Sequence, residues 1–109
     1  MNLLKISEHG SIGEIRMDRP PVNAMNLEFI NALNDAHARL CSDGAEAIII
    51  SGKEGLFSAG LDVPALLGQK RAQIVEFWER FFVLMNSLAA SPVPVAAAIT
   101  AVSYTHLTL

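Results

Sequence analysis

The sequence predicts an α/β fold, and three patterns of apolar residues point to it. Apolar and polar residues alternate near the amino terminus, apolar residues recur at helical spacing in two later segments, and two short runs are apolar throughout. These patterns indicate a half-buried hairpin, amphipathic helices and buried strands respectively. Together they give the order strand, strand, helix, strand, loop, helix, strand. A chain of 109 residues favours a single domain.

The first predicted element is a hairpin. Alternation on either side of His9-Gly10 indicates two short antiparallel strands, over residues 4–8 and 12–17. The run Asp18-Arg19-Pro20-Pro21 ends the second strand, because proline lacks the N–H that a sheet requires and constrains the residue before it. The hairpin therefore leads into a turn.

An amphipathic helix is expected after this turn. Asn26 is a good N-cap residue, and Asp43-Gly44 is expected to stop the helix. The apolar face recurs at intervals of three or four residues. It consists of Leu27, Ile30, Leu33, Ala36 and Leu40.

The next strand and the segment after it are the first indication of a binding site. The apolar run Ala47–Ile50 predicts a strand that is covered on both faces and pairs in parallel. Residues 52–60 carry three glycines and no apolar periodicity, which indicates a loop. Because ligands of α/β proteins favour the carboxyl ends of strands, this loop is a candidate binding segment.

A second helix and a last strand complete the prediction. The helix is expected from Gln73 to Leu88, with an apolar stripe in the core. Residues 91–94 break it, and Val95–Ile99 reads as another buried strand. The apolar stripe consists of Ile74, Phe77, Trp78, Phe81, Met85 and Leu88.

Composition excludes several classes of protein. Hydrophobic residues make up 51% of the chain and the formal charge is −3, which argues against a disordered chain and against a basic nucleic-acid binder. A single cysteine, Cys41, cannot form the disulfide framework of a small secreted domain. The amino terminus also lacks the basic start and apolar stretch of a signal peptide. We therefore expect a cytoplasmic protein.

The distribution of charge raises a membrane alternative. Residues 81–109 contain no Asp, Glu, Lys or Arg. A spanning helix requires about 20 predominantly apolar residues, whereas this segment carries Asn86, Ser87, Ser91, Pro92 and Pro94. A buried helix and strand that need a covering surface are therefore expected instead, with no membrane partner.

Four blocks of sequence resemble the crotonase superfamily, which includes enoyl-CoA hydratases and enoyl-CoA isomerases. The resemblance covers residues 1–100, as the amino-terminal part of the family's acyl-CoA domain, and residues 101–109 depart from the family pattern. The most specific block is F-S-A-G-L-D. The blocks are Arg19–Asn26, Ile48–Gly52, Leu56–Asp62 and Ser91–Ile99.

The resemblance implies a fold, a substrate and an assembly. The fold is a crotonase-like spiral of strand-strand-helix units, of which this chain would hold an incomplete, amino-terminal part. The substrate is an acyl-CoA thioester, so that coenzyme A enters as part of the substrate and no cofactor is bound permanently. The parent protein would be a homotrimer or hexamer.

The resemblance also implies site residues. Family members stabilise a thioester enolate with two backbone N–H groups that form an oxyanion hole, and the motif assigns the first of these to Ala59. The coenzyme would be lined by Ala24 from the earlier turn and, from the F-S-A-G-L-D block, by Phe57, Ala59, Gly60, Leu61 and Asp62.

Several of these side chains have structural alternatives. Asp62 precedes Val63-Pro64 and is expected to cap a helix. Asn23 is expected to be a turn residue that bonds local backbone. Ser58 lacks the G-x-S-x-G elbow of a serine nucleophile. No His, Cys or acidic residues have metal-ligand spacing, so no metal site is expected.

The expected function has two versions. The glycine run of the second oxyanion donor and the family's catalytic glutamates have no counterpart in this sequence, so no general acid or base is assigned. In the first version the chain is a fragment of an enoyl-CoA hydratase or isomerase that binds and polarises acyl-CoA thioesters. In the second it is a non-catalytic acyl-CoA-binding or assembly module.

Overall fold

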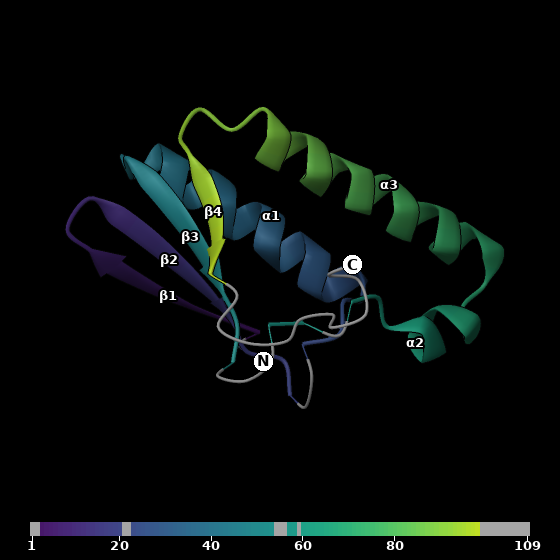
Figure 1. Ribbon diagram of the computed structural model, residues 1–109. Coiled ribbons are helices and arrows are strands. Elements are labelled where there is room, and N and C mark those ends of the chain that lie inside the picture. The colour runs from purple at the N-terminus through teal and green to yellow at the C-terminus, as the bar shows by residue number, and fades with distance from the viewer. Residues whose placement is uncertain (1–2, 21–22, 54–56, 59, 99–109) are drawn as a thin grey trace, which may run out of the picture.

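The fold is a four-stranded sheet with its helices on one side (Figure 1). The computed structural model describes residues 3–20, 23–53, 57–58 and 60–98. The strands are β1 (Leu4–His9), β2 (Ile12–Met17), β3 (Ala47–Ser51) and β4 (Val95–Ala98), in that spatial order. β1 and β2 pair antiparallel, whereas β2, β3 and β4 run parallel. The predicted α/β order and the parallel pairing of the third strand are confirmed.

The hairpin of β1 and β2 turns where the sequence predicts it. His9 pairs with Ile12, which leaves Gly10 and Ser11 as the connection. Gly10 has a φ of 67°, a left-handed conformation that glycine adopts without a steric penalty.

Helix α1 (Leu27–Ser42) supplies more of the buried apolar core than any other described element. It begins as predicted, because Asn26 Oδ1 accepts a hydrogen bond of 2.9 Å from the Phe29 N–H. It ends at the cap residue Asp43, and Gly44 follows with a φ of 90°. The buried side of α1 packs with the sheet residues Ile15, Met17 and Ile48, and it consists of Phe29, Ile30, Leu33, His37 and Leu40.

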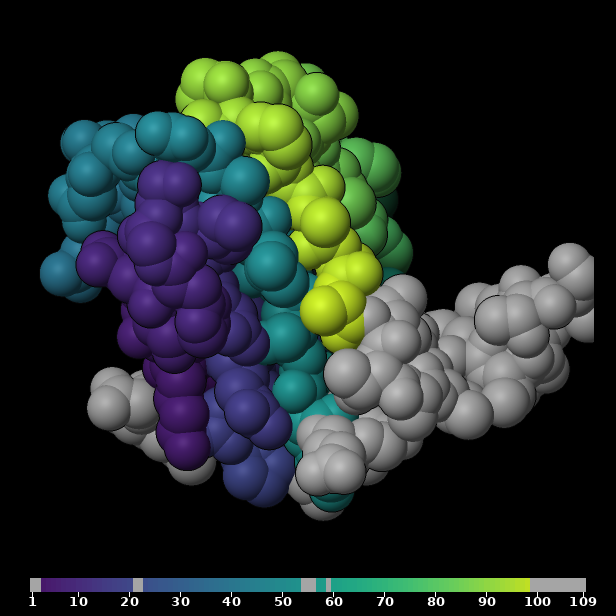
Figure 2. Space-filling view, turned by 60° about the vertical axis from the view of Figure 1, so that its left-hand side comes forward, coloured from purple at the N-terminus to yellow at the C-terminus, as the bar shows by residue number. Residues whose placement is uncertain are grey.

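The second face of the sheet is less covered than the sequence predicts. On the helix side Ile48 is only 1% exposed, whereas Ile49 is half-buried and its neighbour Ala96 on β4 is exposed. Figure 2 looks onto this outer face, where β1 to β4 lie side by side from purple to yellow with α3 behind them. The expectation that β3 is covered on both faces, and that β4 is buried, is therefore wrong for the described residues. The all-apolar run of β3 predicts burial on both faces, but both long helices pack on the same side of the sheet.

Two helices connect β3 to β4. The short α2 (Val63–Leu67) is followed by α3 (Arg71–Ala89), which packs against α1. Only Phe77 and Leu84 of α3 are buried, whereas Trp78 is 38% and Met85 40% exposed. The prediction that the whole aromatic stripe lies in the core is wrong, because one flank of α3 faces α1 and the described residues provide nothing for the other.

The remaining negative predictions concern membranes and metals. Among the described helices, none combines the length and the apolar character that crossing a bilayer requires. The same part of the chain contains no group of three or more His, Cys, Asp or Glu side chains placed to hold a metal ion.

A buried histidine joins α1 to the segment before β4. His37 is 5% exposed, and its Nε2 lies 2.8 Å from Ser91 Oγ and 3.6 Å from Cys41 Sγ. Burial lowers the pKa of His37 below its usual value of 6.5, because the charged imidazolium loses hydration. Cys41 is half-buried rather than enclosed.

The lowered pKa of His37 predicts a loss of stability in weak acid. Below about pH 6.5 the unfolded chain binds a proton that the folded chain resists, so the free energy of unfolding falls as the pH is lowered. The slope from one such group is at most about 1.4 kcal/mol per pH unit. Urea unfolding of the native chain and of His37→Gln, from about pH 7.5 to about pH 5, measures the difference. Equal pH slopes for the two chains would contradict the prediction.

Candidate functional site

The candidate site lies where β2 and β3 end. Residues 18–26, called the turn, follow β2, and residues 52–62, called the loop, follow β3. Because β2 and β3 are parallel, both segments leave the sheet at the same edge, at the bottom of Figure 1. This is the edge at which ligands of α/β sheets bind.

The turn and the loop pair through their backbones. The Met25 N–H donates to the Gly60 carbonyl at 2.7 Å, and the Asp62 N–H donates to the Met25 carbonyl at 2.8 Å. These bonds form a parallel bridge between Met25 and Leu61. Gly60 has a φ of 90°, which a side chain would strain. The loop is thus held closely along the turn.

Asn23 is the buried link between the two segments. It is 3% exposed and has a φ of 53°, a left-handed conformation that is uncommon outside glycine. Its Oδ1 accepts from the Arg19 N–H at 2.7 Å, which confirms the predicted local turn bond. Its Nδ2 donates to the Phe57 carbonyl at 3.0 Å, a contact across 34 positions of sequence.

Ser58 completes this link from the loop. Ser58 is 5% exposed, and its Oγ donates to the Asn23 carbonyl at 2.8 Å. The same Oγ accepts from the Gly60 N–H at 3.0 Å. Both partners are backbone groups, so the hydroxyl is used within the fold. This agrees with the expectation that Ser58 is not a nucleophile.

An ion pair closes the outer side of the site. Arg19 Nη1 lies 2.9 Å from Asp62 Oδ2 and donates to the Ala24 carbonyl at 2.6 Å. Asp62 Oδ1 accepts from the Ala65 N–H at 3.2 Å, so the predicted helix cap is confirmed. The carboxylate therefore has two structural partners. Both side chains of the pair are mostly buried, at 25% and 18% exposure.

The structure brings most of the predicted site residues together. Ala24, Phe57, Gly60, Leu61 and Asp62 all lie on the paired turn and loop. Ala59 lies outside the described residues. The reading of the sequence missed the part played by Arg19 and the long-range bonds of Asn23 and Ser58. These residues stand in the recognised sequence blocks, but a hydrogen bond between distant positions has no local signature.

A second polar cluster lies on the outer face of the sheet. Ser51 Oγ donates to Glu14 Oε2 at 2.5 Å, and His9 Nε2 lies 2.7 Å from Glu14 Oε1. The hydrogen bond from Ser51, and then that from His9, lowers the pKa of the Glu14 carboxyl below its usual value. Glu14 is therefore an anion at neutral pH and unsuited to act as a general acid there.

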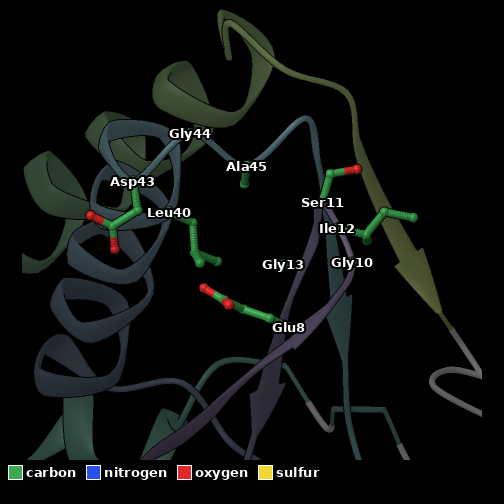
Figure 3. Close-up of a pocket in the computed structure, with 9 residues that line it drawn as sticks. All are labelled: Glu8, Gly10, Ser11, Ile12, Gly13, Leu40, Asp43, Gly44 and Ala45. Carbon is green, nitrogen blue, oxygen red and sulfur yellow. The ribbon is translucent and has the colours of Figure 1, made fainter.

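A cavity lies at the opposite end of the sheet from the candidate site. It has a volume of about 150 Å³ and is bordered by the hairpin turn and by the end of α1. Figure 3 shows the Glu8 carboxylate reaching toward Leu40, with Asp43 on the neighbouring turn. The lining contains these two acidic side chains and no basic one, so it is unsuited to the phosphates of a coenzyme.

Comparison with known families identifies the chain. A sequence profile described as enoyl-CoA hydratase/isomerase matches residues 7–104, which is most of the sequence. The chain belongs to the enoyl-CoA hydratase/isomerase family. The predicted crotonase resemblance is therefore confirmed. The family match includes both the turn and the loop of the candidate site.

Individual relatives agree with this family assignment. The chain is 29% identical over 103 residues to enoyl-CoA delta isomerase 1, mitochondrial, of Rattus norvegicus, which covers 93% of this chain and 36% of the relative. It is 37% identical over 90 residues to enoyl-CoA hydratase domain-containing protein 2, mitochondrial, of Bos taurus, which covers 80% of this chain and 30% of the relative. The chain thus spans about a third of the length of these relatives.

Solved structures of the family share the fold. Human mitochondrial delta3-delta2-enoyl-CoA isomerase superposes with a TM-score of 0.84 at 26% identity, covering 92% of this chain and 40% of the isomerase. A probable enoyl-CoA hydratase of Mycobacterium tuberculosis superposes with a TM-score of 0.81 at 28% identity, covering 88% and 41%. The predicted crotonase-like fold is therefore confirmed, with less than half of each solved chain represented.

The structure predicts that Gly52, at the start of the loop, does not tolerate a side chain. A Cβ on Gly52 would lie 2.5 Å from the carbonyl oxygen and 2.7 Å from the Cα of Phe57, both backbone atoms. We expect Gly52→Ala to lower the free energy of unfolding by about 1–3 kcal/mol in urea titrations. Gly68→Ala is the control, because the nearest atoms there are 3.8 Å away. Equal stability of the two variants would contradict the close contact.

Proposed function

We propose that the chain binds acyl-CoA thioesters at the paired turn and loop and polarises the thioester carbonyl with the backbone N–H of Ala59. The observation that carries the proposal is the bonding of the loop to the turn through Asn23. It supports a binding site at this edge of the sheet, because Phe57 and Ser58 of the loop are fixed against the turn in a member of this family.

The chemistry explains why backbone donors suit this site. Loss or gain of a proton at the α carbon of a thioester passes through an enolate, which places negative charge on the carbonyl oxygen. An N–H group aimed at that oxygen stabilises the charge without reorganisation, and losing one such donor typically costs about 3 kcal/mol. Small residues in the loop allow the backbone to approach the thioester closely.

Coenzyme A enters this proposal as part of the substrate, with no permanently bound cofactor. Ala24, Phe57, Gly60, Leu61 and Asp62 would line it, because all of them lie on the two paired segments. Asp62 would contribute through its backbone and its position, since its carboxylate is engaged by Arg19 and by the α2 cap.

The hydrogen bonds and ion pairs of the carboxylates also limit which residues can act as a general base. A general base needs a carboxylate or imidazole free to reach the substrate proton. Asp62 has two structural partners, and Glu14 is bonded to Ser51 and His9. We therefore infer that this chain contributes binding and polarisation, and that the choice between hydration and isomerisation rests on groups beyond those assigned here. The names of its relatives include both reactions.

Assembly and location are further parts of the proposal. The exposed flank of α3, with Trp78, Phe82 and Met85, is an apolar surface suited to contact with further protein, consistent with a homotrimer or hexamer. A cytoplasmic location remains a prediction from the sequence, whereas the named rat and bovine relatives are mitochondrial proteins.

Binding of coenzyme A should stabilise the folded chain. At a concentration of about a hundred times the dissociation constant, a ligand specific for the native state adds about 2.7 kcal/mol to the free energy of unfolding. Thermal unfolding with coenzyme A and with crotonyl-CoA measures this effect. ATP at the same concentration is the control for phosphate binding alone. If neither coenzyme A nor crotonyl-CoA raises the unfolding temperature, the proposal of a thioester site is rejected.

Turnover by this chain should be negligible. With no assigned acid or base, we expect the absorbance of crotonyl-CoA to stay constant in the presence of the purified chain, although the thioester binds. A complete enoyl-CoA hydratase assayed under the same conditions is the positive control. Hydration at a rate comparable to that enzyme would show that an unassigned group performs proton transfer.

A further inference from the structure

We propose that Asn23 and Ser58 are positioning residues that aim the loop backbone at the thioester carbonyl. The inference deepens the proposed function and rests on it. Neither residue is expected to touch the reacting atoms. Both act through the loop, because their side chains bond to its backbone on either side of sequence position 59.

The conformation of Asn23 indicates more than an ordinary turn. A left-handed φ in a residue other than glycine costs free energy and persists where the surrounding structure enforces it, often at functional sites. Here the side-chain amide uses both ends, with Oδ1 on the Arg19 N–H and Nδ2 on the Phe57 carbonyl. The turn at Asn23 thereby determines where the loop lies.

Ser58 then orients the loop itself. Its Oγ is anchored by the Asn23 carbonyl and accepts the Gly60 N–H. The Gly60 N–H is therefore turned into the protein and is not a donor for a ligand. The Phe57 carbonyl and the Gly60 N–H are both held, so two buried side chains fix the described backbone on either side of position 59.

The Arg19–Asp62 pair does not duplicate this link. It joins the outer ends of the turn and the loop, and its second bond goes to the Ala24 carbonyl. Loss of the Ser58 hydroxyl would leave this pair and the Met25–Leu61 bridge in place. We therefore expect the chain to stay folded and to keep its coenzyme contacts while the Gly60 N–H loses its side-chain partner.

The test compares binding with polarisation. Dissociation constants for crotonyl-CoA and for free coenzyme A are measured for the native chain, Ser58→Ala and Asn23→Gly. Glycine at position 23 keeps access to the left-handed φ and removes only the side-chain bonds. Infrared spectra of bound crotonyl-CoA labelled with ¹³C at the carbonyl report the polarisation of that bond directly.

Two further variants separate positioning from stability. Gly44→Ala strains a left-handed φ of 90° at the opposite end of the sheet and should cost about 1–2 kcal/mol of stability without touching the turn or the loop. Ser58→Thr keeps a hydroxyl and should restore whatever Ser58→Ala loses. Thermal unfolding of every variant gives its stability for comparison.

The expected result is selective for the thioester. The native chain should lower the carbonyl stretching frequency of crotonyl-CoA, and Ser58→Ala and Asn23→Gly should lose most of that shift. Their affinity for crotonyl-CoA should fall about tenfold, the effect of one hydrogen bond, while that for coenzyme A changes less than about twofold. Gly44→Ala should retain both the shift and the affinity.

Two opposite results would overturn different claims. If Ser58→Ala and Asn23→Gly keep the carbonyl shift and the affinity ratio of Gly44→Ala, the two side chains only stabilise the fold and the positioning role is rejected. If the native chain itself binds no crotonyl-CoA, or binds it without a carbonyl shift, the proposed function fails, and the inference fails with it.

Discussion

The hydrogen bonds of Asn23 hold together the two segments on which every functional argument about this chain depends. A buried amide with an unpaired donor or acceptor costs more than an ordinary hydrogen bond stabilises, so the Phe57 carbonyl and the Arg19 N–H are strongly constrained partners. These partners follow different strands, Arg19 after β2 and Phe57 after β3. The amide of Asn23 therefore holds the turn and the loop against each other. The Ser58 hydroxyl extends the same constraint into the loop.

This surface exists because of the sheet beneath it. The parallel register of β2 and β3 sends the turn and the loop out at the same edge, and the packing of α1 on Ile15 and Ile48 holds the two strands in that register. Because Gly52 has no side chain, the backbone of Phe57 can pack directly against the end of β3. Core packing, strand direction and loop geometry thus act in sequence to place a few backbone groups, which is the kind of preorganisation that carbonyl chemistry requires.

The exposed apolar surface of this chain lies mainly on the far flank of α3. The described residues supply no segment to cover this flank, which consists of Val75, Trp78, Phe82, Val83 and Met85. Relatives and solved structures of the family are about two to three times as long as the matched region, and the predicted core residues Trp78 and Met85 belong to this unpartnered surface. Apolar periodicity in the sequence predicts that a helix face is buried, but it does not predict which segment covers that face.

Local patterns in the sequence determined the elements of this protein. The Asn26 cap, the Gly10 turn, the Asp62 cap and the parallel β3 strand all depend on neighbouring residues, and each could be read from a short window. The sequence blocks also indicated the family and the loop that carries its chemistry. Only the tertiary structure decided that Arg19 pairs with Asp62, that Asn23 bonds Phe57, and that the two long helices pack on the same face of the sheet. These contacts join residues far apart in the chain, and their partners are selected by the packing of the sheet and α1 rather than by any local preference.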